Sequence, residues 1–328
     1  MNAGSASLIH ELRPKIVEKR ARLEAAARAV PAEYLNELLA EIDAALGRID
    51  EGSYGICESC HDPIEADQLE SDPLVRFCLD HLNAEQRRAH EQDLELATQI
   101  QSKLLPARDL RAGCWSTHYG YRPAGVVGGD YCEIAASADG RSLFFALGDV
   151  AGKGVAASLL MTHLSAIFRS LLSLDLPLCD LVVRANRLFS ESTAATHFAT
   201  LVAGRADNRG VELCNAGHCS PVVLGRNGTS RVESTGLPLG IFSSGRYAST
   251  LVPLEPGDSL VLFSDGITEA EDPLGNAYEE ERLIRSLGSR READPAALAD
   301  AVLRDIAVFQ GAAPQHDDMT LLIVRRLT

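Results

Sequence analysis

The chain has 328 residues, 46% of them hydrophobic, and a formal net charge of −15 at pH 7. A chain of this length can bury a full core and is long enough for two domains, whereas its negative charge excludes non-specific binding of nucleic acid through a basic surface. No run of about 18 apolar residues occurs, and the N-terminus lacks the apolar core of a secretory signal. We therefore expect a cytoplasmic protein with no direct nucleic-acid partner and no membrane partner.

The N-terminal residues are predicted to be helical. Apolar residues recur there at intervals of three and four, namely Leu35, Leu38, Leu39, Ile42, Leu46 and Ile49. Pro31 is expected to separate two helices. We assign residues 1–50 to N-terminal helices, 51–82 to a small cysteine-bearing module, 83–106 to a linker helix and 107–328 to a larger domain.

The cysteine-bearing module has the ligand spacing of a zinc site. Cys57 and Cys60 are separated by two residues, as are Cys78 and His81, and 17 residues lie between the two pairs. This spacing is typical of tetrahedral zinc, and four protein ligands indicate a closed, structural site for one Zn²⁺. The alternative is a chance cluster of buried cysteines, but a cytosolic protein has little other use for this spacing.

The predicted linker helix is polar apart from a narrow apolar stripe. The stripe consists of Leu94, Ala97, Ile100 and Leu104. A narrow stripe suits a coiled coil or a docking seam, so we expect a homodimer through this helix.

The larger domain is predicted to mix strands and helices. Apolar runs between glycine-rich turns predict strands at 142–150, 197–204, 258–266 and 319–327, and longer periodic runs predict helices at 155–174, 178–192 and 291–309. The order is strands, then helices, then strands again. This grouping favours an α+β layered domain over an alternating βαβ sheet.

Aspartates lie at or near the edges of the predicted strands. They are Asp130 in VVGGDY, Asp149 in LGDVAGKG, Asp265 in LFSDGITEA, and Asp317 and Asp318 in QHDDMTLL. Strand edges can bring distant residues together, and carboxylates beside glycines are what Mg²⁺ or Mn²⁺ prefers. Each site alone is better explained as a turn, but four such sites together favour a metal centre.

The chain from about residue 94 resembles the metal-dependent protein phosphatases of the protein phosphatase 2C superfamily, in particular the SpoIIE/RsbU-like branch. The resemblance rests on ordered blocks: LELATQIQSKLLP, RPAGVVGGDYCEI, FFALGDVAGKGVAASLLM, FATLVAG, NAGHCSPVVL, GLPLGIF, PGDSLVLFSDGITEA and HDDMTLLIV. It implies a central β-sandwich flanked by helices, with a site for two Mn²⁺ or Mg²⁺ at one end.

The same resemblance implies roles for individual residues. Asp149 would bridge both metals, and the carbonyl of Val150 would be a further ligand. Asp265 and Asp317 would bind the first metal, and Asp130 would hold the second through water. Asp149 and Asp265 are the residues on which we expect catalysis to depend most, and the role of Asp318 stays open.

Three further residues are candidates for contact with substrate. Arg122 is the only arginine near the first motif that could grip a substrate phosphate. His218 could be a general acid, although loop histidines more often make local hydrogen bonds. Lys153 could contact phosphate in a nucleotide-binding loop, but the GxxxxGK[ST] spacing is absent, which favours a turn beside the metals.

The cysteine-bearing module resembles a DksA/TraR-type zinc finger. The resemblance covers residues 35–83 and rests on YGICESCHDPIEADQLESDPLVRFCLDHLN. It departs at His81, where that family usually has a fourth cysteine. Because histidine is an acceptable zinc ligand, we expect the finger to keep its fold but to bind zinc more weakly.

Taken together, the residues and the resemblance imply a protein serine/threonine phosphatase that uses a metal-activated water. In the branch that the chain resembles, the usual substrate is a phosphorylated STAS-domain anti-sigma-factor antagonist, whose dephosphorylation frees a sigma factor. The alternative is a catalytically silent transcription-associated binding or sensor module. Such a module would lack a metal ligand, whereas all four expected aspartates are present.

Overall fold

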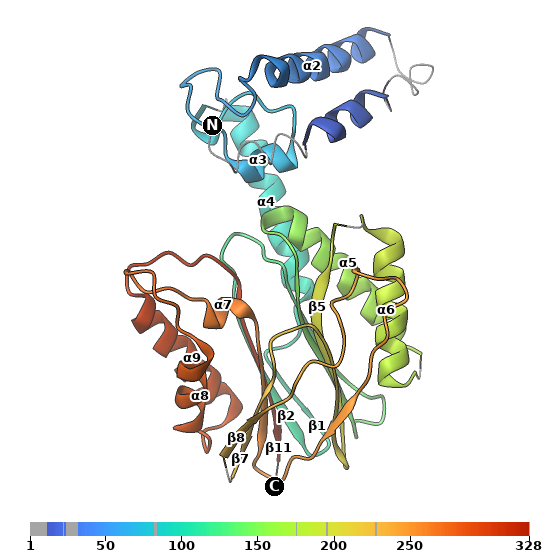
Figure 1. Cartoon of the computed structure of the whole chain (residues 1–328), viewed down its shortest axis with the longest axis vertical. Helices are drawn as coiled ribbons and strands as arrows, with labels where there is room; N and C mark the ends of the chain where they lie inside the picture. Colours follow the sequence, from blue (N-terminus) through green and yellow to red (C-terminus); the bar gives the residue numbers. More distant parts are fainter. Residues whose placement is uncertain are drawn as a thin grey trace. The chain divides into compact units, whose positions relative to one another are not determined.

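The computed structural model describes residues 12–21, 23, 32–81, 84–174, 176–194, 196–226 and 228–327. The chain divides into two compact units, Met1–Leu96 and Ala97–Thr328, and the division falls inside helix α4 (Ala84–Leu104) (Figure 1). The helix break expected at Pro31 lies outside the described residues.

The first unit, here called the finger unit, is helical with one loop-rich segment. Residues 12–21 are helical, and α2 (Ala32–Glu51), α3 (Ala66–Ser71), the 3₁₀ turn η1 (Leu79–His81) and the first part of α4 follow. Its small core joins Leu12 and Ile16 of the first helix to Ile42 and Ala45 of α2, with Tyr54, Ile64 and Leu69 from the loop-rich segment. The predicted apolar stripe of α2 thus faces this core, because Leu46 and Ile49 also pack against it.

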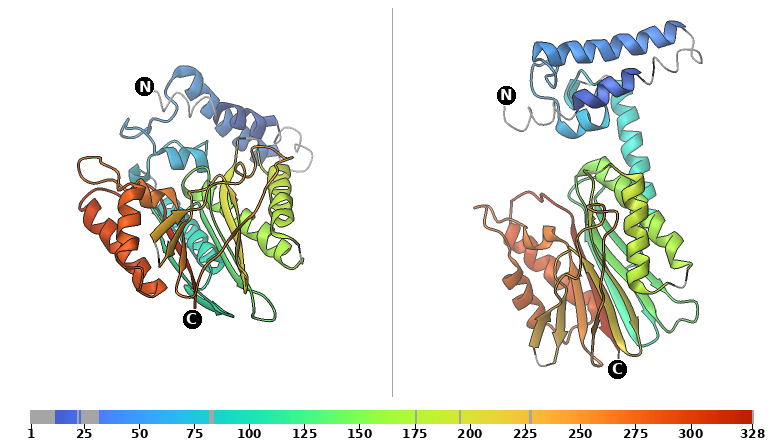
Figure 2. Two further views of the ribbon diagram at one scale, coloured as in Figure 1. Left: turned by 60° about the horizontal axis from the view of Figure 1, so that its bottom comes forward. Right: turned by 45° about the vertical axis from the view of Figure 1, so that its right-hand side comes forward.

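The second unit, here called the sandwich unit, contains two antiparallel sheets (Figures 1 and 2). The six-stranded sheet has the order β1 (Asp109–Ala112), β2 (Trp115–Arg122), β11 (Met319–Arg326), β10 (Ser259–Phe263), β7 (Val222–Gly225) and β8 (Gly228–Arg231). The five-stranded sheet has the order β3 (Asp130–Ala136), β4 (Leu143–Val150), β5 (Ala199–Asp207), β6 (Gly210–Ala216) and β9 (Thr250–Val252). Strands distant in sequence therefore become neighbours, above all β2 and β11.

Helices cover the outer face of each sheet. Helices α5 (Gly154–Leu172) and α6 (Leu178–Ser192) pack on the five-stranded sheet. Helices α8 (Glu280–Gly288) and α9 (Pro295–Gln310) pack on the six-stranded sheet, and α7 (Asp265–Thr268) is one turn after β10. This arrangement confirms the predicted α+β class with a β-sandwich flanked by helices (Figure 2).

Three apolar clusters fill the spaces between these layers. The cluster between the two sheets includes Trp115, Phe145, Leu262 and Leu322. One outer cluster joins the five-stranded sheet to α5 and α6, and the other joins the six-stranded sheet to α8 and α9. Helix α5 is long and apolar enough to cross a membrane by composition, but residues such as Phe168 bury their side chains against the sheet. Core packing accounts for that composition.

The strands and helices predicted for the larger domain are all present, and the structure differs at two boundaries and in elements that were not predicted. The strand expected at 258–266 ends at Phe263, and Asp265 instead begins α7. The helix expected from 291 begins at Pro295, because Asp294 accepts a hydrogen bond from the amide of Ala297 (2.9 Å) and caps it. Helix α8 and the strands β1, β2, β3, β6, β7, β8 and β9 were not among the predicted elements.

Candidate functional site

Two of the candidate carboxylates are cross-strand neighbours in the five-stranded sheet. Asp130 is the first residue of β3 and Asp149 is the penultimate residue of β4, and the antiparallel register pairs them directly. Side chains paired in this way have Cβ atoms roughly 5 Å apart. The register therefore brings together two aspartates that the intervening hairpin separates in sequence.

The other two candidates meet at the end of the six-stranded sheet. Asp265 follows β10, and Asp317 lies two residues before β11, the antiparallel neighbour of β10. Ser264 joins the two strand ends, because its hydroxyl donates to the carbonyl of Asp318 (3.0 Å) and accepts from the amide of Thr320 (2.9 Å). This local network fixes Asp265 beside Asp317.

Asp318 joins the two pairs of carboxylates. Its carboxylate accepts hydrogen bonds from the amides of Ala124 (2.8 Å) and Gly129 (2.7 Å), so it holds the loop that leads into Asp130. The hydroxyl of Thr320, on β11, donates a hydrogen bond to the carboxylate of Asp130. Asp318 and Thr320 therefore align the end of one sheet with the end of the other. The open role of Asp318 is, on this geometry, to position the loop.

Two glycines allow the loop before Asp130 to lie close to the carboxylates of Asp318 and Asp149. A Cβ on Gly128 would overlap the carboxylate of Asp318 and the hydroxyl of Tyr121. A Cβ on Gly129 would lie 3.2 Å from the carbonyl oxygen of Val150 and 3.5 Å from Oδ1 of Asp149. The Val150 carbonyl and the Asp149 carboxylate thus approach the same point next to Gly129, as expected for two ligands of one site.

The last turns of α4 hold the same loop from its other side. The side-chain amide of Gln101, which is buried, donates to the carbonyl of Gly128 (2.6 Å) and accepts from its amide (3.1 Å). One turn earlier, the hydroxyl of Thr98 donates to the carbonyl of Val126 (3.4 Å). The end of α4 is therefore attached directly to the loop that positions Asp130.

Burial and mutual repulsion perturb the acidic groups. Burial, followed by the neighbouring charges of Asp265 and Asp317, raises the pKa of Asp149 to about 7. Burial, followed by the charge of Asp149, holds the pKa of Asp130 well above its usual range. The pKa of Asp265 is also raised, by burial and then by Asp317. A group of carboxylates that repel one another binds cations favourably, because a cation removes the repulsion.

Lys153 supplies positive charge to this site. Its ammonium group lies 3.2 Å from Oδ2 of Asp317 and donates to the carbonyl of His316 (2.8 Å). The nucleotide-loop explanation is not supported, because Lys153 contacts the acidic residues. Glu269 was not predicted from the sequence: burial raises its pKa, followed by the charges of Asp265 and Asp317, which indicates a further carboxylate close to those two. Its position four residues after Asp265, one helical turn on, was the available signal.

Arg122 and His218 differ in their relation to the site. Arg122 ends β2 and pairs with Met319, so it lies at the acidic end of its sheet, but within the described residues no hydrogen bond or ion pair joins its guanidinium to the carboxylates. Burial lowers the pKa of His218 to about 4, and its Nδ1 lies 2.8 Å from the hydroxyl of Thr200. A neutral, buried ring favours the local hydrogen-bonding role over that of a general acid.

The four expected zinc ligands converge in the finger unit. One ligand atom from each of Cys57, Cys60, Cys78 and His81 lies within 4.8 Å of the others, the single such group found in the part of the chain that the structure describes. Burial acts to raise the pKa of Cys57, but backbone amides of Cys60, Cys78 and Ser59 lower it to about 6. Sulfur and nitrogen donors at this separation fit a tetrahedral metal ion.

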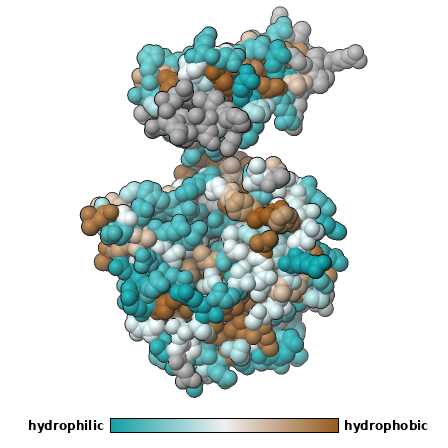
Figure 3. All heavy atoms as spheres, viewed as in Figure 1, coloured by the Kyte–Doolittle hydropathy of each residue, from teal (hydrophilic) through white to brown (hydrophobic). Residues whose placement is uncertain are grey.

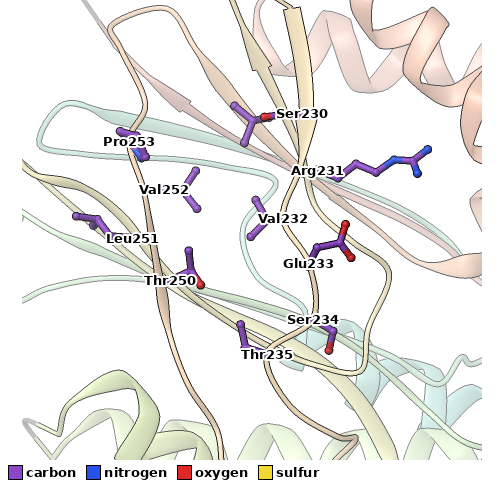
Figure 4. A pocket seen from close by; sticks show the side chains of 11 residues that line it. Ser230, Arg231, Val232, Glu233, Ser234, Thr235, Thr250, Leu251, Val252 and Pro253 are labelled. Atoms are coloured by element: carbon purple, nitrogen blue, oxygen red, sulfur yellow. The ribbon is translucent and has the colours of Figure 1, made fainter.

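A cavity away from the candidate carboxylates lies elsewhere in the sandwich unit. It has a volume of about 350 Å³ and lies between the edge strands β8 and β9, lined by residues 230–235 and 250–253 together with Val223. Figure 4 shows that Arg231 points away from it, and this side chain pairs with Glu280 (2.7 Å). The cavity contains none of the candidate carboxylates, so we do not assign the chemistry to it.

Comparison with known families agrees with this geometry. The model of the Stage II sporulation protein E (SpoIIE) family matches residues 139–327, which is more than half of the chain. This chain belongs to the SpoIIE family. The match includes Asp149 near the end of β4, Asp265 after β10 and Asp317 before β11.

Individual relatives of this SpoIIE-family chain are distant. Protein IcfG of Synechocystis is 27% identical over 268 residues, which are 71% of this chain and 41% of IcfG. Phosphoserine phosphatase RsbU of Bacillus subtilis is 26% identical over 238 residues, covering 71% of this chain and 70% of RsbU. The chain therefore spans less than half of the length of IcfG.

A solved structure supports the fold assignment. The SiaA-PP2C domain of Pseudomonas aeruginosa superposes with a TM-score of 0.64 at 22% identity, covering 74% of this chain and 99% of that domain. At this identity the likeness shows the phosphatase 2C-like fold of the sandwich unit.

Proposed function

We propose that the chain is a metal-dependent protein serine/threonine phosphatase that hydrolyses phosphoserine or phosphothreonine. The observation that carries this proposal is the convergence of Asp130, Asp149, Asp265 and Asp317 at one end of the sandwich, where strand register and the Asp318 network hold them together. RsbU, a relative over most of its length, is a phosphoserine phosphatase.

The acidic site fits two Mn²⁺ or Mg²⁺ ions. Hard divalent cations prefer carboxylate and carbonyl oxygens, and Asp130, Asp149, Asp265, Asp317 and the Val150 carbonyl offer only such donors. When bound, a pair of such ions lowers the pKa of a water and neutralises charge on phosphoryl oxygens.

The protein's own groups prepare the site for a phosphate ester. Asp318 and Gln101 fix the loop before Asp130, so that the carboxylates are already aligned before substrate arrives. Lys153 beside Asp317 offers a cation that can contact a phosphate oxygen, and Arg122 is retained as a second candidate. Both side chains suit a dianionic substrate group.

The finger unit is proposed to bind one structural Zn²⁺ through Cys57, Cys60, Cys78 and His81, as a DksA/TraR-type finger. All four ligands come from the protein, which leaves no position for substrate. The chain is proposed to work in the cytoplasm, since no disulfide joins any of the eight cysteines, all of which the structure describes.

The substrate is proposed to be a phosphorylated STAS-domain anti-sigma-factor antagonist in a partner-switching pathway. This proposal rests on the SpoIIE/RsbU-like membership of the sandwich unit. A homodimer through α4 is also proposed, with Ile100 exposed on the apolar stripe of that helix. Sedimentation of Ile100→Glu against the wild type tests the dimer: an unchanged oligomeric state would exclude it.

The phosphatase proposal is tested by metal-dependent hydrolysis of a phosphoserine protein and of p-nitrophenyl phosphate. We expect activity with Mn²⁺ that Asp149→Asn and Asp265→Asn each lower by at least about a hundredfold, because each removes a charged metal ligand. Asp300→Asn, an exposed aspartate on α9, is the matched control. Wild-type protein without activity on either substrate would favour the catalytically silent binding or sensor module.

A further inference from the structure

Four large apolar side chains are exposed close together in the sandwich unit. They are Phe198, Leu237, Ile241 and Phe242, with exposed fractions from 40% to 60%, and we call them the apolar ledge. Figure 3 shows several separate apolar patches on the visible face of this unit, one of them near α5. Exposed apolar side chains in a group mark interaction surfaces.

The segment that carries three of these side chains is held by a buried asparagine. Asn186, on α6, accepts a hydrogen bond from the amide of Gly240 (2.9 Å) and donates to the carbonyls of Phe242 (2.9 Å) and Ser243 (3.3 Å). Its side chain is fully buried. The ledge is therefore ordered before any partner arrives, which lowers the entropic cost of binding.

The ledge begins beside the proposed metal centre. In the five-stranded sheet Val150 pairs with Ala199, and Ala199 in turn makes two backbone hydrogen bonds with Leu239 (2.8 and 2.9 Å). Adjacent strands are about 4.8 Å apart, so Leu239 lies roughly 10 Å from Val150. The carbonyl of Phe198 also accepts from the amide of Ala151 (3.0 Å), directly after the proposed metal ligand.

A small hollow opens on the ledge. It has a volume of about 40 Å³ and is lined by Leu237, Pro238, Phe242, Gly245, Arg246 and Tyr247. The lining is mostly apolar, and the volume admits the tip of one aliphatic side chain rather than a ring.

We propose that the apolar ledge docks the phosphoprotein substrate and takes an apolar side chain that lies three residues from the phosphoserine. The proposal rests on the phosphatase activity proposed above. An extended segment advances about 3.3 Å per residue, so three residues span the roughly 10 Å from Val150 to Leu239, which lies between Leu237 and Ile241 of the ledge. The backbone of Phe198 is hydrogen-bonded to Ala151, two residues after Asp149, so the ledge continues directly into the acidic site that a phosphoprotein must enter, and this continuity favours substrate as the occupant.

Two phosphoserine peptides of equal length and charge test this docking. One has leucine three residues before and after the phosphoserine, and the other has serine at both positions. With Mn²⁺ we expect wild-type kcat/KM to be about tenfold higher for the leucine peptide, the effect of burying part of one aliphatic side chain. Phe242→Ser and Leu237→Ser should each bring the ratio of the two values close to one.

A matched control removes an exposed apolar side chain far from the ledge in sequence. Val308, on α9, is 83% exposed, and Val308→Ser should keep the tenfold ratio. Thermal unfolding of each variant shows whether it is folded.

Two outcomes would overturn the docking proposal without contradicting the proposed phosphatase activity. They are equal wild-type kcat/KM values for both peptides, and a ratio that is unchanged in the ledge variants. A wild-type dimer that Phe242→Ser dissociates would overturn it in favour of a second copy. No metal-dependent hydrolysis of either peptide would instead remove the proposed function itself.

Discussion

The two candidate metal sites differ in how the chain brings their ligands together. In the finger unit, Cys57, Cys60, Cys78 and His81 lie within one short loop-rich segment. In the sandwich unit, the carboxylates are spread from Asp130 to Asp317 and meet only because two sheets pack face to face. Local spacing defines the first site, whereas tertiary structure defines the second.

The units also differ in what would hold them together without metal. The finger unit has one small core cluster, and Cys57 and Cys78 are themselves part of it. The sandwich unit has three large clusters, none of which contains a carboxylate. Small domains with a limited core usually depend on a bound metal or a disulfide. Loss of metal should therefore unfold the finger unit and leave the sandwich unit folded.

The largest expected effect is the unfolding of the finger unit. Cys78→Ser should unfold the finger unit, because structural zinc contributes on the order of 10 kcal/mol to the folding of small zinc domains. Hydrogen exchange read by mass spectrometry should show lost protection in α2 and full protection in β4 and β11. The control is Cys114→Ser in the sandwich unit, which should still bind one zinc per chain. Full protection of α2 in Cys78→Ser would show that the finger does not need the metal.

A smaller effect is expected at the glycine that admits Asp318. Gly128→Ala should destabilise the sandwich unit by about 1–3 kcal/mol and weaken Mn²⁺ binding, because the new Cβ would displace the carboxylate of Asp318. Urea unfolding and Mn²⁺ titration measure the two effects. Gly288→Ala, in α8, has nothing within 4 Å of the new Cβ and should leave both measurements close to wild type.

Gln101 tests the attachment of α4 to the acidic site. Gln101→Ala leaves the amide and carbonyl of Gly128 without their side-chain partner, which should cost about 1–2 kcal/mol and raise the Mn²⁺ concentration needed for half-maximal activity. Gln99→Ala, at an exposed position of the same helix, is the matched control. Equal metal requirements in both variants would show that the loop keeps its position without Gln101.

The smallest effect is a pH dependence of stability. The pKa of Asp149 is raised in the folded protein to about 7, so the folded state binds its proton more tightly than the unfolded state does. This contribution is fully present below the unfolded pKa, near 3.8, and is lost as pH rises through about 7. Without Mn²⁺ or Mg²⁺, stability should therefore increase by about 1.4 kcal/mol between pH 8 and pH 6. Urea unfolding at both values should show this gain in the wild type and lose it in Asp149→Asn.

Sequence alone predicted the parts of the structure that depend on local pattern. The apolar periodicity of α5 and α6 and the apolar runs of β4 and β11 were sufficient to predict these elements, because an element that packs on the core needs such a pattern of apolar residues. The start of α9 was placed too early, since the cap at Asp294 and Pro295 outweighs the helical propensity of the residues before it.

The candidate site could be predicted only in part from the sequence. Glycine-flanked aspartates at strand ends indicated a metal centre, but no spacing rule places Thr320 against Asp130 or Gln101 against Gly128. These contacts depend on the packing of elements far apart in sequence. Lys153 and Glu269 were underestimated for the same reason, because their role follows from the position of Asp317.

The division of the carboxylates between the two sheets has a mechanical consequence. Asp130 and Asp149 move with the five-stranded sheet, and Asp265 and Asp317 move with the six-stranded sheet. Any sliding of one sheet over the other changes the distance between the two pairs. The contacts made by Asp318 and Thr320 resist that sliding. The spacing of the carboxylates that we propose bind metal therefore depends on how the two sheets of the sandwich are aligned.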